Sequence, residues 1–395
     1  MSQRSLSGYR RLLLNAPMVG RDRGEDHRAS TPLELFFDLV FVVAVSHASG
    51  HLQRGLAEGR VGSSLASYAL VFFGIWWAWV NFTWFASAYD NDDVFFRLFV
   101  FVTMTGALIL AAGIGPAFEE RDYTITVIGY VVMRIALVTQ WVRAARDDPE
   151  RRATAYRYAV GVAFCQVGWV AASMLPPDRW LWAAILLAPL ELLVPVWAES
   201  ASPTTWHPEH IEERYGLFMI IVLGESVLAA STAIQSVTAD GGLTGQLVAI
   251  AAGGLLILFS IWWMYFDRPE KRFLTTTRSV FVWGYMHFLV FGSVAAIGAG
   301  LALSIETGSR SAELSSAGVG AAVAVPVAIT ILCLWALYVN VSDPPLRRFG
   351  IPVTAALAIS AAVTPAPVLV IGLLLSLLLA VKVMVRLGVD SEIVA

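Results

Sequence analysis

The 395-residue chain has few charged residues and few cysteines. Charged residues make up 14% of it, against about 25% in soluble domains, and its mean hydropathy is +0.67. Nucleic-acid binding is not indicated, and the net charge of -3 says little about partners, because in a membrane protein the location of the positive charges matters more. The two cysteines, Cys165 and Cys333, fall in separate apolar segments and predict neither a disulfide framework nor a zinc site. These scarcities indicate a polytopic membrane protein whose main partner is the lipid bilayer.

The common catalytic motifs are also missing. We find no phosphate-binding loop, dinucleotide fingerprint, His-Glu-x-x-His zinc motif or nucleophile elbow. His207, His210 and Glu213 have a spacing that could suit a divalent ion, but Pro208 and the neighbouring acids are typical of a helix N-terminus, which we favour. The sequence thus predicts no catalytic residue and no metal site, leaves any cofactor unknown, and argues more against an enzyme than for one.

Long apolar runs predict an all-α bundle of about twelve transmembrane helices, since about 20 apolar residues cross the hydrocarbon core. The last two are interrupted by Gly and Pro, so ten or eleven crossings remain alternatives. The expected spans are 32–53, 62–88, 93–115, 122–143, 154–175, 179–198, 211–236, 244–266, 279–303, 315–340, 348–363 and 366–388.

Positive residues favour one orientation of these spans. With the N-terminus inside, 20 of the 27 Lys and Arg fall on the cytoplasmic side, five on the other and two within spans. The chain is therefore expected to have both termini in the cytoplasm, which requires an even number of spans.

Two aromatic runs suggest an internal repeat. Phe73–Asn81 and Phe259–Asp267 share an Ile-Trp-Trp core at an offset of 186 residues, and weaker matches follow in the same order. Six spans per copy would make the halves run in the same direction. We therefore expect a basic cytoplasmic tail (1–31), a first six-helix half (32–198), a cytoplasmic linker (199–210), a second half (211–388) and a short cytoplasmic tail (389–395).

Two stretches resemble the signatures of a known family. They are Thr31–Val42, with the sequence TPLELFFDLVFV, and Glu213–Val227, with the sequence ERYGLFMIIVLGESV. Together with the run that ends at Asp267, they resemble the bacterial low-temperature-requirement A (LtrA) family over about residues 30 to 385. The resemblance implies a multi-pass protein of the bacterial inner membrane. It implies no reaction, because the family name describes a growth phenotype.

Glu225 stands out because it lies near the middle of an apolar segment. A charged side chain at that depth costs roughly 2.5–3.5 kcal/mol on insertion scales, so we expect it to face a polar partner or water. Arg134 and His287 lie at a matching depth in other spans and are the expected partners. Glu191, between two prolines of the sixth span, is expected either to reach Arg134 or to bind a permeant cation.

A second group of charges is expected near the cytoplasmic ends of the spans. Glu34 and Asp38 are four residues apart and share one helix face. By depth, Arg97 is the expected partner of Asp38. Glu213 and Arg214 begin the seventh span at the same level.

Two functions fit these charges. The first is a proton- or ion-coupled transporter or channel with a central site around Glu225, moving a proton or a small solute. The alternative is a membrane-embedded enzyme or a cofactor- or lipid-binding protein that uses Asp38, Glu34, Glu213 and Arg214 at the interface. A stress-related scaffold is a third possibility. The purely structural interpretation is that these charged residues form ion pairs or hydrogen bonds that fix helix packing.

Overall fold

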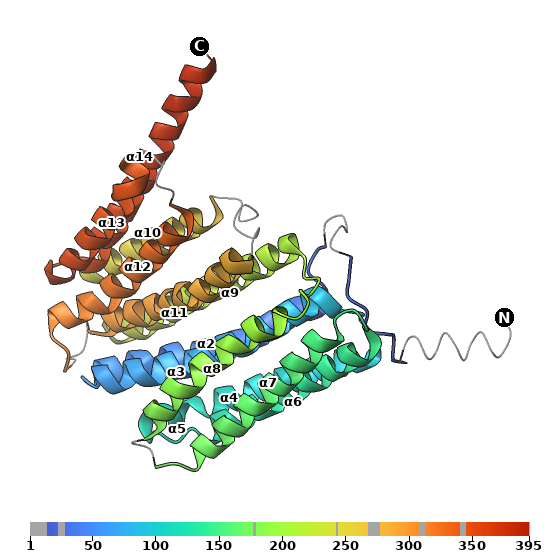
Figure 1. The fold of residues 1–395 in the computed structure, drawn as a ribbon. Coiled ribbons are helices and arrows are strands. Elements are labelled where there is room, and N and C mark those ends of the chain that lie inside the picture. The colour runs from blue at the N-terminus through green and yellow to red at the C-terminus, as the bar shows by residue number, and fades with distance from the viewer. Residues whose placement is uncertain are drawn as a thin grey trace. The chain divides into compact units, whose positions relative to one another are not determined.

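The structure is a computed structural model that describes residues 14–22, 28–176, 179–241, 244–267, 277–307, 313–339 and 345–394. All regular elements in these ranges are helical (Figure 1), which confirms the all-α class. The helices are α2 (Pro32–Ala57), α3 (Val61–Tyr89), α4 (Val94–Ala112), α5 (Ile114–Glu119), α6 (Thr124–Asp147), α7 (Arg152–Ser173), α8 (Trp180–Glu199), α9 (Pro208–Gly241), α10 (Gly245–Phe266), α11 (Thr277–Thr307), α12 (Ser316–Tyr338), α13 (Pro345–Ser360), the short 3-10 helix η3 (Ala361–Val363) and α14 (Pro367–Val394).

Each of the twelve predicted spans corresponds to one helix. Within the described residues, ten of these helices are long and apolar enough to cross a membrane. The two others are α7 and the 16-residue α13, which is short for a crossing. About twelve spans therefore remains the appropriate description of the chain.

The helices group into two compact units. Unit 1 comprises residues up to Ala48 together with Ala66–Leu217, and unit 2 comprises Ser49–Leu65 together with Phe218–Ala395. In unit 1, α6 packs against both α4 and α7, and α7 packs against α8; in unit 2, α12 packs against α11, α13 and α14, and α14 also packs against α10. The predicted six-helix halves divide the chain at 199–210, whereas the boundaries between the units fall within α2, α3 and α9. The internal repeat stays a prediction.

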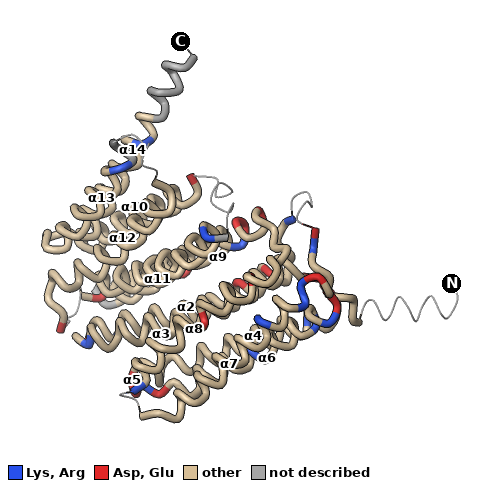
Figure 2. Tube along the Cα trace, viewed as in Figure 1, with Lys and Arg blue, Asp and Glu red and all other residues tan. Residues whose placement is uncertain are grey.

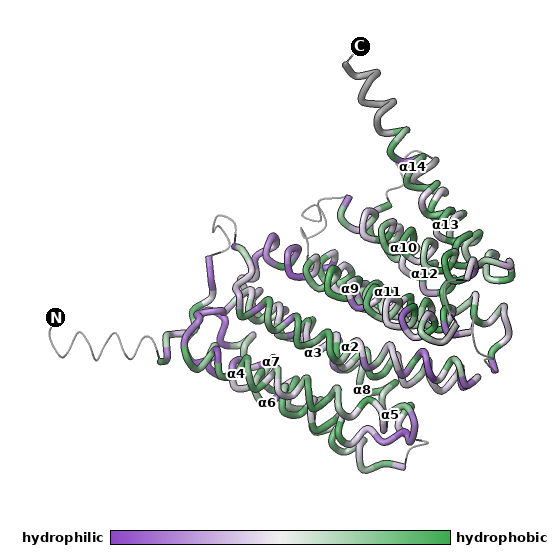
Figure 3. Tube along the Cα trace, turned by 180° about the vertical axis from the view of Figure 1, so that it is seen from behind, coloured by the Kyte–Doolittle hydropathy of each residue, from purple (hydrophilic) through white to green (hydrophobic). Residues whose placement is uncertain are grey.

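Apolar side chains of unit 1 are exposed along its helices, as expected for surfaces that contact lipid. Phe164 and Val167 on α7 are each 70% exposed, and Trp182 on α8 is 71% exposed. Figure 3 shows the helices coloured mainly as hydrophobic along their length, with the polar residues gathered at their ends.

Charged residues gather at one end of unit 1 (Figure 2), where α2, α4, α7 and α9 begin and α3, α6 and α8 end. The segment 14–22 lies at this end, because three aspartates accept its backbone amides. Ala16 N donates to Asp93 at 2.8 Å, Met18 N to Asp147 at 3.2 Å and Gly20 N to Asp148 at 3.3 Å. These residues belong to the predicted basic tail 1–31, of which residues 1–13 and 23–27 lie outside the described part.

Candidate functional site

The first turn of α2 places Glu34 by a capping box. The backbone N–H of Glu34 donates to Thr31 Oγ1 at 3.2 Å, and the Thr31 backbone N–H donates to Glu34 Oε2 at 2.9 Å. Pro32 occupies the first helical position, where its missing N–H has no partner to lose. The reciprocal bonds leave the second carboxylate oxygen of Glu34 free to face the interior.

That oxygen, Glu34 Oε1, is surrounded by three basic groups. Arg214 Nη1 and His210 Nε2 on α9 each lie 3.1 Å from it, and Arg28 Nη2 lies at 3.4 Å. The side chains of Glu34, His210 and Arg214 are completely buried. His210 and Arg214 are four residues apart on α9, as Glu34 and Asp38 are on α2, so the two helices present matched pairs.

Asp38 binds the Arg214 guanidinium on the side that does not face Glu34. Arg214 donates from Nε to Asp38 Oδ2 at 3.0 Å and from Nη2 to Oδ1 at 2.6 Å, a bidentate pair. The indole N–H of Trp79 on α3 also donates to Asp38 Oδ1, at 2.7 Å. The predicted Glu34 and Asp38 pair thus shares one arginine.

Arg28 and Asp90 complete the group. Arg28 Nη1 donates to the carbonyls of Ala86 and Ser87 in the last turn of α3, at 3.0 and 2.7 Å, and Nη2 donates to Asp90 Oδ2 at 3.2 Å. Burial, and then the Glu34 charge, raise the pKa of Asp90 to about 6, although Arg28 opposes the shift. We call the set Arg28, Glu34, Asp38, Asp90, His210 and Arg214 the acid–arginine cluster.

The acid–arginine cluster has unbalanced charge. Three carboxylates face two guanidiniums, so these six residues by themselves carry one net negative charge when His210 is neutral. Arg21 approaches them from outside, with its Nη1 3.4 Å from the Asp90 carbonyl oxygen. Nε2 of His210 is close to Glu34, but neither ring nitrogen makes a hydrogen bond of ordinary geometry. A single added proton would neutralise the cluster.

A second buried group lies between α6 and α8. Arg134 Nη2 lies 3.3 Å from Glu191 Oε2, and the Tyr130 hydroxyl accepts from Arg134 and donates to Glu191. Arg134 and Glu191 have side chains that are 2% and 3% exposed. This is one of the two arrangements expected for Glu191, and the alternative pairing of Arg134 with Glu225 stays a prediction.

The predicted pairing of Arg97 with Asp38 is wrong. Arg97 donates to the two carboxylate oxygens of Asp92 at 2.8 and 2.6 Å, and both side chains of this pair are 55% exposed. Depth along the helix axis suggested the pairing, but Arg97 is largely exposed whereas Asp38 is completely buried.

The remaining predicted residues are not members of the acid–arginine cluster. Glu213 accepts the backbone N–H of Ser30 at 3.1 Å. In unit 2, His287 Nδ1 donates to the Trp283 carbonyl at 2.7 Å, and the Tyr265 hydroxyl lies 3.1 Å from Nε2. Glu225 is partly buried on α9, and its pairing with His287 stays a prediction.

Sequence reasoning missed Arg28, Asp90, Trp79 and the inward position of His210. The sequence did contain a signal for the position of His210. Glu34 and Asp38 are four residues apart, and so are His210 and Arg214. In the described residues, no group of three His, Cys, Asp or Glu side chains is arranged to hold a metal ion. His210 instead faces Glu34.

These features define a multi-pass helical membrane protein with ionic groups buried between its helices. The model of the bacterial low temperature requirement A protein (LtrA) family matches residues 29–385, and the chain belongs to that family. The chain is also 26% identical over 292 residues to the uncharacterized protein RA0937 of Rhizobium meliloti (strain 1021). The match covers 69% of each sequence.

Proposed function

We propose that the chain is a proton-coupled membrane transporter or channel in which the acid–arginine cluster binds and releases a proton. The observation that carries this proposal is the charge imbalance of a closed site. Glu34, Asp38 and Arg214 are 0% exposed, and all lie on helices apolar enough to span a membrane. Buried ionisable groups of this kind mark ion and proton paths in membrane proteins.

The size and charge of the site favour a proton over a larger ligand. An uncompensated charge in a low-dielectric interior costs several kcal/mol, so the cluster gains from binding one positive charge. Its side chains already contact one another at hydrogen-bonding distance, which leaves no room for a hydrated cation between them. A proton can be accepted without displacing any group.

Asp90 is the group that sets the pH at which the acid–arginine cluster binds or releases its proton. Its pKa, raised to about 6 from the usual value near 3.8, means that the folded protein holds this proton at pH values where an unfolded chain would release it. Asp90 therefore stabilises the fold as the pH falls through about 6 and carries a poorly compensated charge above it. Proton binding and release are expected near that pH.

The enzyme or lipid-binding alternative has less support. Asp38, Glu34 and Arg214 do converge, as that reading expected. However, their complete burial leaves no face of these side chains that a lipid headgroup or substrate could contact.

The experiment is proton flux in proteoliposomes that contain a pH-sensitive dye, under an imposed membrane potential. We expect Asp90→Asn, which resembles the protonated residue, to reduce flux at least tenfold and to remove its pH dependence between pH 5 and 7. Asp92→Asn is the matched control, because Asp92 lies two residues away, is exposed, and has a φ of 51° that asparagine tolerates. Equal flux in native protein and Asp90→Asn at every pH would remove the cluster from the mechanism.

The same assay tests the central site predicted from the sequence. We retain Glu225 as a second proton-binding candidate, supported by its partial burial on a membrane-spanning helix. Glu225→Gln should lower flux if the proton passes through unit 2 as well.

A further inference from the structure

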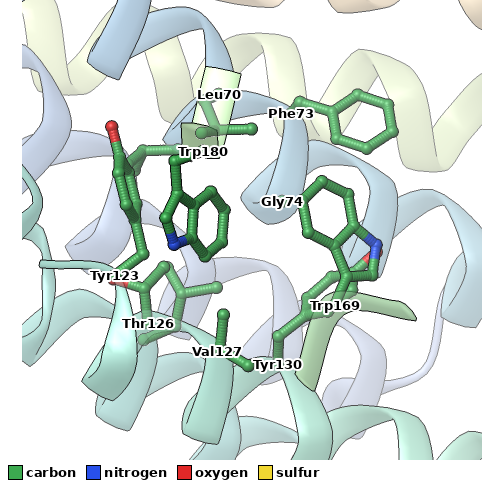
Figure 4. A pocket seen from close by; sticks show the side chains of 11 residues that line it. Leu70, Phe73, Gly74, Tyr123, Thr126, Val127, Tyr130, Trp169 and Trp180 are labelled. Carbon is green, nitrogen blue, oxygen red and sulfur yellow. The ribbon is translucent and has the colours of Figure 1, made fainter. Parts of the chain in front are cut away.

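The two ends of unit 1 differ in chemistry. Near the start of α6, a half-open pocket has an almost wholly apolar and aromatic wall, and none of its described lining residues is charged (Figure 4). Near the end of α6, the acid–arginine cluster lies beside the segment 14–22, which we call the N-terminal strap. Because apolar pockets do not hold water, the charged end is where protons can reach the cluster.

The N-terminal strap binds this end through alternate residues. Residues 16–22 form no helix, and the backbone amides of Ala16, Met18 and Gly20 each donate to an aspartate. Met18 is 0% exposed, whereas its neighbour Val19 is 60% exposed. Every second residue of the strap therefore faces the protein, and Met18 anchors it.

The strap joins three connections between helices. The Ala16 carbonyl accepts from Asn91 Nδ2 at 3.0 Å, in the connection between α3 and α4. Gly20 lies against the two others, because a Cβ there would be 3.1 Å from Asp148 Oδ2, after α6, and 2.8 Å from Thr205 Oγ1, before α9. A side chain at position 20 would thus force the strap or these neighbours to move.

The last part of the strap lies over the chain segment that presents Asp90. Arg21 N donates to the Ala88 carbonyl at 3.1 Å, in the last turn of α3, and Arg21 Nη1 donates to the Asp90 carbonyl at 3.4 Å. Ala88 is 0% exposed and Asp90 is 8% exposed. The strap therefore helps to bury the residue whose pKa sets proton binding by the cluster.

We propose that the N-terminal strap is a gate that separates Asp90 from water at the charged end of unit 1, and that protons exchange with the acid–arginine cluster when the strap leaves its site. The gating role rests on the proposed function. The strap can leave without unfolding a helix, because its partners lie in connecting segments and at helix ends. Among the described strap residues Met18 alone is buried, and segments with few buried apolar contacts open most easily.

Closure of the site can be tested without measuring flux. A water-soluble carbodiimide couples an amine to accessible carboxyl groups, and mass spectrometry then gives the labelling of each aspartate. Asp92 is 55% exposed and serves as the internal standard for Asp90. Met18→Asp puts an unpaired charge into a fully buried site, which is unfavourable, so the strap should leave and the labelling of Asp90 relative to Asp92 should rise at least fivefold. Val19→Asp, at the exposed neighbouring position, is the matched control and should leave this ratio unchanged.

Gly20→Leu releases the strap by a different route, through the close contacts at position 20, and should raise the labelling of Asp90 in the same way. Its control is Gly62→Leu, because a Cβ on Gly62 meets no atom within 4 Å. In the proteoliposome assay, Met18→Asp and Gly20→Leu should both increase proton flux at least fivefold, and neither control should change it.

The two readouts separate the gate from the proposed function. Equal labelling of Asp90 in native protein, Met18→Asp and Gly20→Leu would overturn the gate. If its labelling rises but flux does not, while Asp90→Asn still abolishes flux, the gate is wrong and the proton-coupled function stands. If no variant alters flux, Asp90→Asn included, the proposed function is wrong and the gating role falls with it.

Discussion

Arg214 is the residue on which two carboxylates depend. Its guanidinium binds Asp38 through two hydrogen bonds and lies 3.1 Å from Glu34, with all three side chains fully buried. Five N–H donors in a fixed planar fork suit this double contact, and a lysine could not reproduce it. Residues 34, 38 and 214 therefore form one electrostatic unit.

We predict that Arg214→Gln strongly destabilises the protein. Removing one partner of a buried ion pair costs about 3–5 kcal/mol, because the other charge stays buried without compensation. The measurement is the midpoint of thermal unfolding, followed by tryptophan fluorescence of purified protein in detergent. Arg214→Lys should lie between native protein and Arg214→Gln.

Arg97→Gln is the control, because its ion pair with Asp92 is largely exposed and such pairs contribute little. A similar fall in the midpoint for Arg97→Gln and Arg214→Gln would show that the burial of the cluster has no energetic consequence.

The sequence predicted the acid pair and the common depth of Glu34, Asp38 and Arg214, because helical spacing fixes both. It could not predict which arginine pairs with which acid. Depth is one coordinate, whereas pairing also depends on how each helix is rotated about its axis. Arg97 was assigned a wrong partner for this reason, and Arg28 and Asp90 were missed because both lie in connecting segments.

At the level of elements, α4 and α6 approach each other through glycine. A Cβ on Gly129 would lie 2.3 Å from Leu110 N and 2.5 Å from the Gly106 carbonyl oxygen. A Cβ on Gly106 would in turn meet the Gly129 carbonyl oxygen at 2.7 Å. Small residues allow such backbone contact in membranes, where packing rather than the hydrophobic effect drives helix association.

Gly129→Ala is therefore expected to lower the thermal midpoint by several degrees, because backbone atoms cannot move aside as a flexible side chain can. Gly50→Ala, where the added methyl meets nothing within 4 Å, should leave the midpoint unchanged or raise it. Alanine is the better helix former by about 1 kcal/mol. The prediction fails if the two variants shift the midpoint in the same direction.

The helices were more predictable than the contacts between them. All twelve apolar segments became helices, because a backbone in hydrocarbon must satisfy its own hydrogen bonds. Pro189 and Pro195 did not break α8, which runs unbroken over 20 residues. The boundaries between the compact units, within α2, α3 and α9, leave no mark in the sequence because they fall in continuous helices.

For the whole molecule, orientation decides from which side protons reach the acid–arginine cluster. The cluster lies at the end of unit 1 where α6 ends and α7 begins, and five arginines lie between residues 143 and 157. Because positive loops stay in the cytoplasm, this end is predicted to face the cytoplasm. The opposite end, with the segment between α5 and α6, is then predicted to face outward.

Single cysteines test this orientation with little background, because the native Cys165 and Cys333 are buried. Glu120 and Glu150 are both exposed and lie at opposite ends of α6. A membrane-impermeant maleimide should label Glu120→Cys in intact cells, and Glu150→Cys only after the membrane is permeabilised. The reverse pattern would place the cluster on the outer side, and protons would then reach it from outside the cell.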